Sequence, residues 1–359
     1  MKAAVLSSFG SPLTVTHRPD PLLGTGEVVV DVAAAPVLAY AGEVFSGERR
    51  YLLDLPAIPG CGAVGRVRAV GPDATRLSVG DWVFCDPTVR SRDDALTPDI
   101  TLQGWSARGE GGQRLQRYFH DGAFAEQVRV PTENAFRLGA IEASDAARWC
   151  ALTTCLVPYG GLVAGDLRAG ETVLISGATG HFGSAAVLVA LAMGAGCVVA
   201  PGRNERVLAD LVRRFGSRVR PVVLRGDEAH DRAQMMAAAP GPIDCVLDLL
   251  PPSATTAPVR AAAMTVRQGG RVVLMGGVGM LGGPDLALPY PFLMRNSITV
   301  RGQWMCPREA VVRMIALVQA GVLSLDPFAL TSFALDQVSE AVAHAAAHAG
   351  PFAMTVLAP

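Results

Sequence analysis

The sequence predicts an α/β protein with a doubly wound parallel sheet and a second, β-rich domain. From about residue 144, strand-like apolar runs alternate with helix-like runs, which is typical of βαβ units. A glycine-rich turn joins the first strand of that series to an apolar helix. The first third carries short β-type runs between Gly, Pro and Asp instead. With about 150 residues in a typical domain, the chain is long enough for two or three domains.

The β-type runs of the first third come in the order 3–6, 27–33, 65–70, 82–85 and 123–130. Between the last two, residues 86–122 are rich in Arg, Asp, Gln and Gly, with Trp105 and Tyr118-Phe119 as isolated aromatic anchors. We interpret this stretch as a long polar excursion, either a surface lobe or a lid.

The alternating series begins with a helix that Ser144 could cap. Strands are expected at 172–176, 197–200, 222–224, 243–249, 271–275 and 298–301, and helices at 146–155, 183–193, 205–215, 228–238 and 258–265. After the last of these strands come helices at 307–320 and 336–347 and a final strand at 353–357. We expect this tail to fold back onto the first domain.

Composition excludes several classes of function. The chain has 31 basic and 32 acidic residues, which argues against an extended nucleic-acid-binding surface. Lys2 is the only lysine, so Schiff-base and P-loop chemistry lack their internal lysine. The longest apolar run, 185–193, is too short to span a bilayer. Neither nucleic acid nor a membrane is therefore an expected partner.

The seven cysteines are an odd number and form no CxxC pair. The chain also begins with an apolar run too short for a signal peptide. A disulfide framework belongs to short secreted chains, so these features predict a reduced, cytoplasmic protein.

The strongest chemical signal is the turn after the strand at 172–176. It has the form A-x-G-x-x-G, a dinucleotide-binding fingerprint with alanine in the first position. Small residues let the backbone approach a pyrophosphate, whose charge lies at the helix N-terminus. The predicted cofactor-binding residues are Gly177, Ala178, Thr179, Gly180, His181, Phe182 and Gly183, together with Gly276 after the strand at 271–275.

The end of the next strand indicates which dinucleotide is preferred. An acidic residue there would bind the ribose 2′-hydroxyl of NAD(H), but Arg203 and Asn204 follow this strand instead. This favours NADP(H), with NAD(H) as the alternative if Arg203 only stacks on adenine or faces solvent.

Short motifs along the whole chain resemble those of the medium-chain dehydrogenase/reductase superfamily. They are MKAAVL at 1–6, IPGCGAVG at 58–65, VGDWV at 79–83, GAFAE at 122–126, the turn at 177–183 and ITVRG at 298–302. The resemblance implies a GroES-like domain from 1–153, a Rossmann domain at 154–301, and a return to the first domain at 302–359. It also implies a cleft for the nicotinamide and a homodimer joined near 298–301.

The zinc-binding members of this superfamily carry a Cys at one position and Gly-His-Glu at another. Here Leu38 stands at the first, and Cys61 and Gly62 replace the His and Glu. Four closely spaced cysteines of a structural zinc lobe are missing from 86–122. Zinc needs three or four protein ligands, so no zinc is expected. Leu38 also replaces the Asn of the quinone-reductase-like pattern.

Without zinc, a hydrogen-bond donor must stabilise the charge that develops on the substrate. The resemblance aligns Tyr40 with the hydroxyl residue of zinc members, and Glu43 with the histidine that ends a proton relay in some of them. Tyr40 could equally be a wall or core residue, and Glu43 a solvated charge. Cys61, His120 and Trp304 are further candidates for the substrate pocket.

Three functions remain open from the sequence. The first is an NADPH-dependent, zinc-independent reductase of a small-molecule activated acceptor, such as a quinone, an α,β-unsaturated carbonyl or an electron-poor ketone. The second is a carbonyl reductase or alcohol dehydrogenase in which Tyr40 is the acid/base. The third is a non-catalytic NAD(P)H-binding sensor or scaffold.

Overall fold

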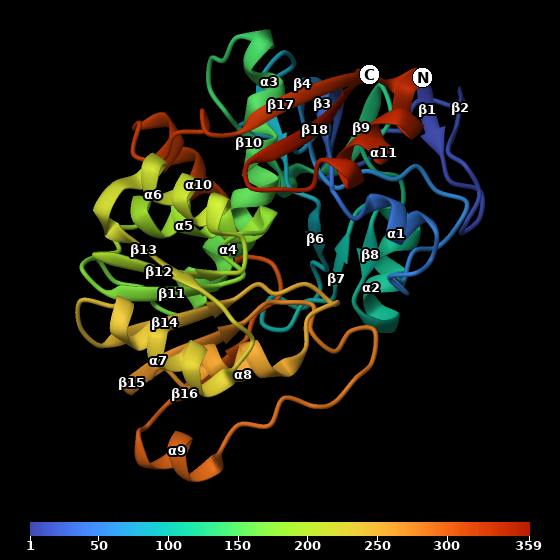
Figure 1. The fold of residues 1–359 in the computed structure, drawn as a ribbon. Helices are drawn as coiled ribbons and strands as arrows, with labels where there is room; N and C mark the ends of the chain where they lie inside the picture. Colours follow the sequence, from blue (N-terminus) through green and yellow to red (C-terminus); the bar gives the residue numbers. More distant parts are fainter. The chain divides into compact units, whose positions relative to one another are not determined.

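The computed structural model describes residues 1–359, and these divide into two compact units (Figure 1). Unit 1 comprises Met1–Thr153, Leu325–Ala349 and Ala353–Pro359, and unit 2 comprises Thr154–Ser324 and Gly350–Phe352. The mixed α/β fold class predicted from the sequence is confirmed. Unit 2 continues to Ser324, beyond the expected end at 301, because the helix α10 (Arg308–Gln319) and the segment before it belong to this unit. No helix is both long and apolar enough to cross a membrane.

Unit 2 is built on a six-stranded parallel sheet with the order β13-β12-β11-β14-β15-β16. The strands are β11 (Thr172–Ser176), β12 (Cys197–Gly202), β13 (Val219–Val223), β14 (Ile243–Asp248), β15 (Val266–Leu274) and β16 (Thr299–Gly302). The helices are α4 (Ala151–Ala164), which begins in unit 1, α5 (His181–Ala192), α6 (Glu205–Phe215), α7 (Glu228–Ala238), α8 (Thr256–Ala263), α9 (Tyr290–Arg295) and α10 (Arg308–Gln319).

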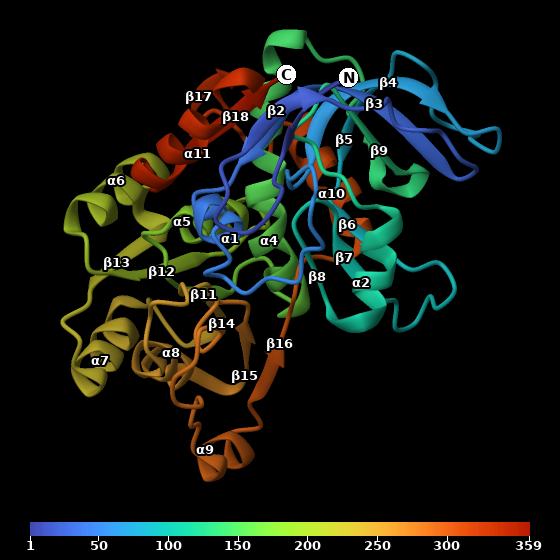
Figure 2. The same cartoon turned by 90° about the vertical axis from the view of Figure 1, so that its right-hand side faces the viewer.

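Helices cover both faces of this sheet, as a doubly wound fold requires. Figures 1 and 2 show α5 and α6 on one face and α7 and α8 on the other. The middle strands read as continuous apolar runs because both of their faces are buried; all of β11 is buried. The strand order reverses between β11 and β14, so the carboxyl ends of these two strands form the switch point at which such folds bind ligands.

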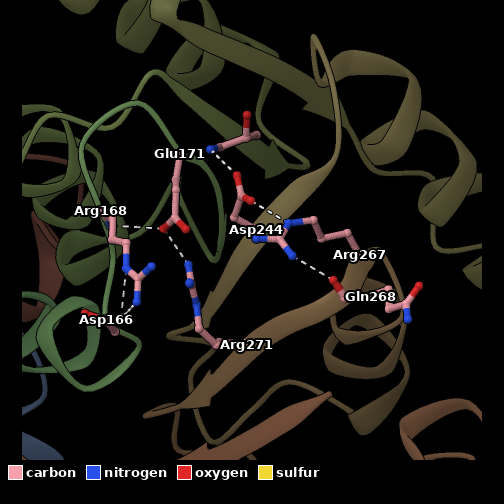
Figure 3. A network of polar contacts seen from close by, with 8 residues as sticks. Asp166, Arg168, Glu171, Asp244, Arg267, Gln268 and Arg271 are labelled. Carbon is pink, nitrogen blue, oxygen red and sulfur yellow. Dashed lines mark hydrogen bonds and ion pairs between the residues drawn. The ribbon is translucent and has the colours of Figure 1, made fainter. Parts of the chain in front are cut away.

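Charged side chains are paired at the amino ends of the same strands (Figure 3). The Asp244 carboxylate accepts hydrogen bonds from the Thr172 backbone N–H (2.8 Å) and from the Arg267 guanidinium (2.6 Å). Glu171 binds Arg271 and the backbone N–H of Arg168. These contacts join β11, β14 and β15 through groups that are mostly part-buried, so this edge contributes to stability.

Unit 1 is mainly antiparallel. Its largest sheet has seven strands in the order β10-β5-β4-β3-β18-β17, with β9 also paired to β3, and β1 and β2 form a separate hairpin. The strands are β1 (Lys2–Val5), β2 (Thr14–His17), β3 (Glu27–Val37), β4 (Ala63–Val70), β5 (Trp82–Cys85), β9 (Gln127–Pro131), β10 (Ala135–Arg137), β17 (Ala329–Ala334) and β18 (Ala353–Ala358). Its helices are α1 (Ala41–Phe45), α2 (Gly109–Tyr118), α3 (Ala146–Trp149) and α11 (Val338–Ala347).

The C-terminal strand returns to this sheet, because β18 pairs with β3 through the registers Thr355–Val37 and Leu357–Ala35. Residues 86–122, expected as a long polar excursion that is either a surface lobe or a lid, contain a small sheet of β6 (Thr88–Arg90), β7 (Ile100–Leu102) and β8 (Ser106–Ala107), followed by α2. Trp105 and Phe119 are buried here, whereas Tyr118 is exposed. The stretch is therefore a folded lobe.

Several predicted boundaries were wrong. β2 and β17 were not predicted, because their side chains are mostly exposed and polar or small. β13 begins three residues earlier than expected; it is an edge strand, where Pro221 is tolerated. The helix expected at 146–155 is divided into α3 and the longer α4.

Candidate functional site

The glycine turn between β11 and α5 leaves no room for a side chain at its last glycine, Gly183. A Cβ on Gly183 would overlap the carbonyl oxygen of Gly177, so the first turn of α5 lies directly against the turn. Gly177 itself has a φ of 87°, which favours glycine. Ala178 is fully buried. The turn therefore has the geometry that lets a backbone approach a pyrophosphate.

The N-terminus of α5 can receive an anion. The N–H groups of a first helical turn have no partners within the helix, and Gly180 offers no side-chain cap to them. The His181 side chain is held away by a 2.9 Å contact between its Nε2 and Thr154 Oγ1 on α4, and it meets the Phe182 ring edge-on. His181 therefore offers its backbone N–H to a ligand, while its imidazole is tied to α4.

The turn also contacts the end of the neighbouring strand. A Cβ on Gly202, the last residue of β12, would overlap the Thr179 side chain. Arg203 follows at once and is exposed. Asn204 caps α6 by accepting a hydrogen bond from the Val207 N–H (3.2 Å). Of the two cofactor-binding residues predicted here, Asn204 uses its side chain to cap α6, whereas the Arg203 side chain is exposed and accessible to a ligand.

A buried carboxyl group that the sequence analysis missed lies at the switch point. Asp248 ends β14 and accepts a 2.8 Å hydrogen bond from the Ser176 hydroxyl at the end of β11. Burial raises the pKa of Asp248 to about 6, against the opposing effect of hydrogen bonds from Ser176 and the Leu250 N–H. Gly276 lies against this carboxylate, since a Cβ there would come within 2.5 Å of it. The only signal in the sequence was an acidic residue ending an apolar strand.

In unit 1, Tyr40 precedes α1 and is half-buried among aromatic and charged groups. Its ring meets Trp105 edge-on at 5.8 Å, and the Arg49 guanidinium lies 4.3 Å from its centroid. Burial raises the pKa of Tyr40 well above its usual value, with smaller upward effects from Tyr51 and Cys61, while Arg49 opposes the shift. The phenol is therefore held in its neutral, proton-donating form.

The Glu43 carboxylate makes no hydrogen bond to Tyr40 and instead accepts a 2.6 Å hydrogen bond from the Arg49 guanidinium. Arg49 is 12% exposed and Glu43 46%, so the pair runs from the ring of Tyr40 toward solvent. Tyr51 belongs to the same cluster, and burial raises its pKa too. Arg49 and Tyr51 were not predicted, because only the fold brings the loop after α1 back over Tyr40.

The three predicted pocket residues occupy different surroundings. Cys61 is buried, and burial raises the pKa of its thiol, so a reactive thiolate is disfavoured. Both ring nitrogens of His120 are engaged, with Asp121 Oδ1 (3.0 Å) and the Asp54 carbonyl oxygen (3.1 Å). The Asp121 carboxylate raises the pKa of His120. Trp304 follows β16 in unit 2 and is 40% exposed.

No group of three or more His, Cys, Asp or Glu side chains is arranged to hold a metal ion. Leu38 is buried and apolar, and Gly62 has no side chain that could bind a metal. All seven cysteines are buried and none forms a disulfide.

The parallel sheet, its strand order and the glycine turn define a nucleotide-binding α/β enzyme fold. Two family models match the chain: the alcohol dehydrogenase GroES-like domain over residues 24–140, and the zinc-binding dehydrogenase family over residues 182–320. Together they cover well over half of the chain. The chain belongs to the medium-chain dehydrogenase/reductase superfamily, and it is an oxidoreductase rather than the non-catalytic sensor or scaffold considered above.

Named relatives fall in the same superfamily. The chain is 34% identical over 219 residues to an alcohol dehydrogenase of Rhizobium meliloti, a match that spans 59% of this chain and 62% of that one. It is 28% identical to an acryloyl-coenzyme A reductase of Metallosphaera sedula over 82% of both chains. A solved Sinorhizobium meliloti structure bound to NADP has a TM-score of 0.78 at 19% identity, covering 100% of this chain and 99% of that chain, and shows the shared fold.

Proposed function

We propose that this protein is an NADPH-dependent, zinc-independent reductase of an activated acceptor: a quinone, an α,β-unsaturated carbonyl or an electron-poor ketone. The observation that carries the proposal is that the chain has both a glycine turn in unit 2 and a half-buried, neutral phenol in unit 1, without a metal-ligand cluster. A bound nicotinamide cofactor supplies the hydride. The turn at 177–183 and the N-terminus of α5 would hold its pyrophosphate.

The role proposed for Tyr40 is to donate a proton to the acceptor as negative charge develops on it. A neutral phenol is a suitable donor, and Arg49 beside the ring favours the phenolate left behind. The Arg49–Glu43 pair keeps the guanidinium in place. Arginine does not pass on a proton at neutral pH, so Glu43 cannot receive the proton through Arg49. The role proposed for Glu43 is therefore to hold the Arg49 guanidinium in position beside Tyr40.

The activated acceptor follows from the absence of a strong Lewis acid. Zinc would polarise a carbonyl by several kcal/mol. Leu38, Cys61 and Gly62 cannot provide three ligands of suitable type, so the protein must work with hydrogen bonds alone. Substrates that already stabilise negative charge need the least help.

The first experiment measures NADPH oxidation at 340 nm with a panel of quinones, enones and ketones. Tyr40→Phe should lower kcat at least about tenfold, because it removes the proton donor. Tyr118→Phe, at an exposed tyrosine of the same unit, is the matched control and should leave the rate unchanged. An unaltered rate in Tyr40→Phe would remove the phenol from the mechanism.

A second candidate is a carbonyl reductase or alcohol dehydrogenase that uses Tyr40 as acid/base. Relatives named alcohol dehydrogenase favour it, whereas the relative named acryloyl-coenzyme A reductase favours reduction of an activated C=C bond. The same panel separates the two: turnover of simple ketones and alcohols supports the second candidate, and turnover of enones or quinones alone supports the first.

The proposed assembly is a homodimer joined through β16. This strand pairs only with β15 and is exposed along its length, and Tyr290 and Met294 on the adjacent α9 are also exposed. Such an edge offers unpaired backbone groups to a second copy. Val300→Asp should give a monomer in light scattering after size-exclusion chromatography, whereas Val322→Asp, at an exposed site in the same unit, should not.

We also propose a cytoplasmic location, where seven thiols stay reduced.

A further inference from the structure

We propose that Arg225, at the end of β13, is a second phosphate-binding residue that acts together with Arg203 to select the 2′-phosphate of NADPH. This inference rests on the cofactor proposed above and names a specificity residue that the glycine-loop pattern does not include. It follows from the register of two neighbouring strands, the contacts of one loop, and the absence of partners for two guanidinium groups.

The register places the two arginines at adjacent strand ends. β12 and β13 are parallel, with Gly202 opposite Val223, and the Leu224 N–H donates to the Gly202 carbonyl (2.9 Å). Neighbouring strands lie about 4.8 Å apart. Arg203 follows β12 by one residue and Arg225 follows β13 by two. Both residues therefore lie just beyond the carboxyl ends of neighbouring parallel strands.

The carboxyl end of β12 also contacts the cofactor turn. The Thr179 side chain packs against Gly202, immediately before Arg203. In a fold with this strand order, the adenosine ribose lies beyond the end of the second strand. A phosphate on that ribose would therefore lie beside the two arginines, and the pyrophosphate beside the turn.

The loop that carries Arg225 is fixed by a buried acid. Asp231, on the first turns of α7 and 5% exposed, accepts hydrogen bonds from the Arg225 N–H (2.8 Å) and the Gly226 N–H (2.9 Å). Asp227 caps α7 through the His230 N–H (2.7 Å). These contacts fix the backbone that carries Arg225, and neither carboxylate forms an ion pair with its guanidinium.

Both guanidinium groups are available to a ligand. Arg203 and Arg225 are exposed, and neither side chain makes an ion pair or a hydrogen bond within the protein. Many other arginines of this chain do pair, including Arg260, which binds Glu228 close by. Two guanidinium groups without ion-pair partners at neighbouring strand ends favour a ligand group with two negative charges. A phosphate has this charge, and its oxygens match the geometry of the guanidinium donors.

The test measures equilibrium binding of NADPH and NADH by fluorescence, and of 2′,5′-ADP and 5′-AMP as competitors, to the full chain. Arg225→Ala should weaken NADPH and 2′,5′-ADP about 10- to 100-fold and change NADH and 5′-AMP less than about twofold. Arg203→Ala should behave alike, and Arg225→Lys should recover part of the loss. Arg220→Ala removes the same charge near the amino end of β13 and should leave all four ligands unchanged.

The outcomes separate this inference from the cofactor proposal. If the wild type prefers NADPH but Arg225→Ala keeps that preference, or loses NADPH and NADH equally, the role of Arg225 is overturned and the cofactor proposal stands. If the wild type binds NADH and NADPH equally, and 2′,5′-ADP no better than 5′-AMP, the preference for NADP(H) itself is overturned.

Discussion

In the parallel sheet of unit 2, charged side chains are paired at the amino ends of the strands and unpaired or buried at the carboxyl ends. At the amino ends of β11, β14 and β15, acidic and basic side chains are matched and largely part-buried (Figure 3). At the carboxyl ends, the chain provides glycines, two arginines without partners, and one buried acid with a raised pKa. Matched charges stabilise the fold, whereas groups left unmatched by the protein can be matched by a ligand.

This difference leads to a separation of effects. Variants at the amino ends of the strands should lower the free energy of unfolding and leave cofactor binding intact. Variants at the carboxyl ends of the strands should change cofactor binding or, at the buried Asp248, the pH dependence of stability. Four substitutions test the comparison, from the largest expected effect to the smallest.

Gly183→Ala should have the largest effect. Its methyl group would overlap the Gly177 carbonyl oxygen and displace the turn, so NADPH should bind at least about 100-fold more weakly, or about 2.7 kcal/mol. Gly241→Ala is the control, because nothing lies within 4 Å of a Cβ there and its φ is not in the left-handed region. Wild-type affinity in Gly183→Ala, measured by fluorescence titration, would show that the turn does not hold the cofactor.

Asp244→Ala should lower the free energy of unfolding by about 2 kcal/mol, because it leaves the Thr172 N–H and the Arg267 guanidinium without their shared acceptor. Urea denaturation measures the loss. The NADPH dissociation constant of the folded variant should stay within about twofold of the wild type. A large change in that constant would contradict the separation between the two ends of the strands.

Asp248→Asn should change how stability depends on pH. The wild-type carboxyl has a folded pKa of about 6, above the usual unfolded value of about 3.9, so the folded state holds an extra proton between these values. Stability from this group is therefore full below about pH 4 and is lost as pH rises through 6. Urea unfolding at pH 5 and pH 8 should show the variant gaining on the wild type by about 1–2 kcal/mol; a constant difference would rule out a raised pKa.

Arg168→Ala should have the smallest effect. Its ion pair with Asp166 is exposed on both sides, and such pairs contribute about 0–1 kcal/mol. The variant should unfold within about 0.5 kcal/mol of the wild type. A loss as large as that of Asp244→Ala would mean that the network acts as a single unit rather than through its part-buried members.

The sequence predicted the fold of unit 2 well because its strands are long apolar runs and its glycine turn is local. It predicted unit 1 less fully. Short strands such as β17 leave most side chains exposed, so they lack an apolar pattern. The lobe at 86–122 depends on contacts of Trp105 with Tyr40 and Phe45, which are remote in sequence.

The site follows the same division. The turn at 177–183 could be predicted because its chemistry lies in consecutive residues. Arg49 beside Tyr40, and Arg225 beside the strand end that carries Arg203, could not, because their roles depend on loops and registers that only the folded chain defines. Asp248 was missed because its burial, not its position in a motif, gives it an unusual pKa.

Because every cysteine is buried, the reactivity of the native thiols can report when a unit of the protein unfolds or opens. Burial raises the pKa of the thiols of Cys61, Cys150 and Cys155, so a thiol-specific dye should react with the folded protein only when a unit opens. Cys61, Cys85 and Cys150 lie in unit 1, and Cys155, Cys197, Cys245 and Cys306 in unit 2. Mapping labelled peptides over time would therefore give a separate opening rate for each unit, without introducing any label site.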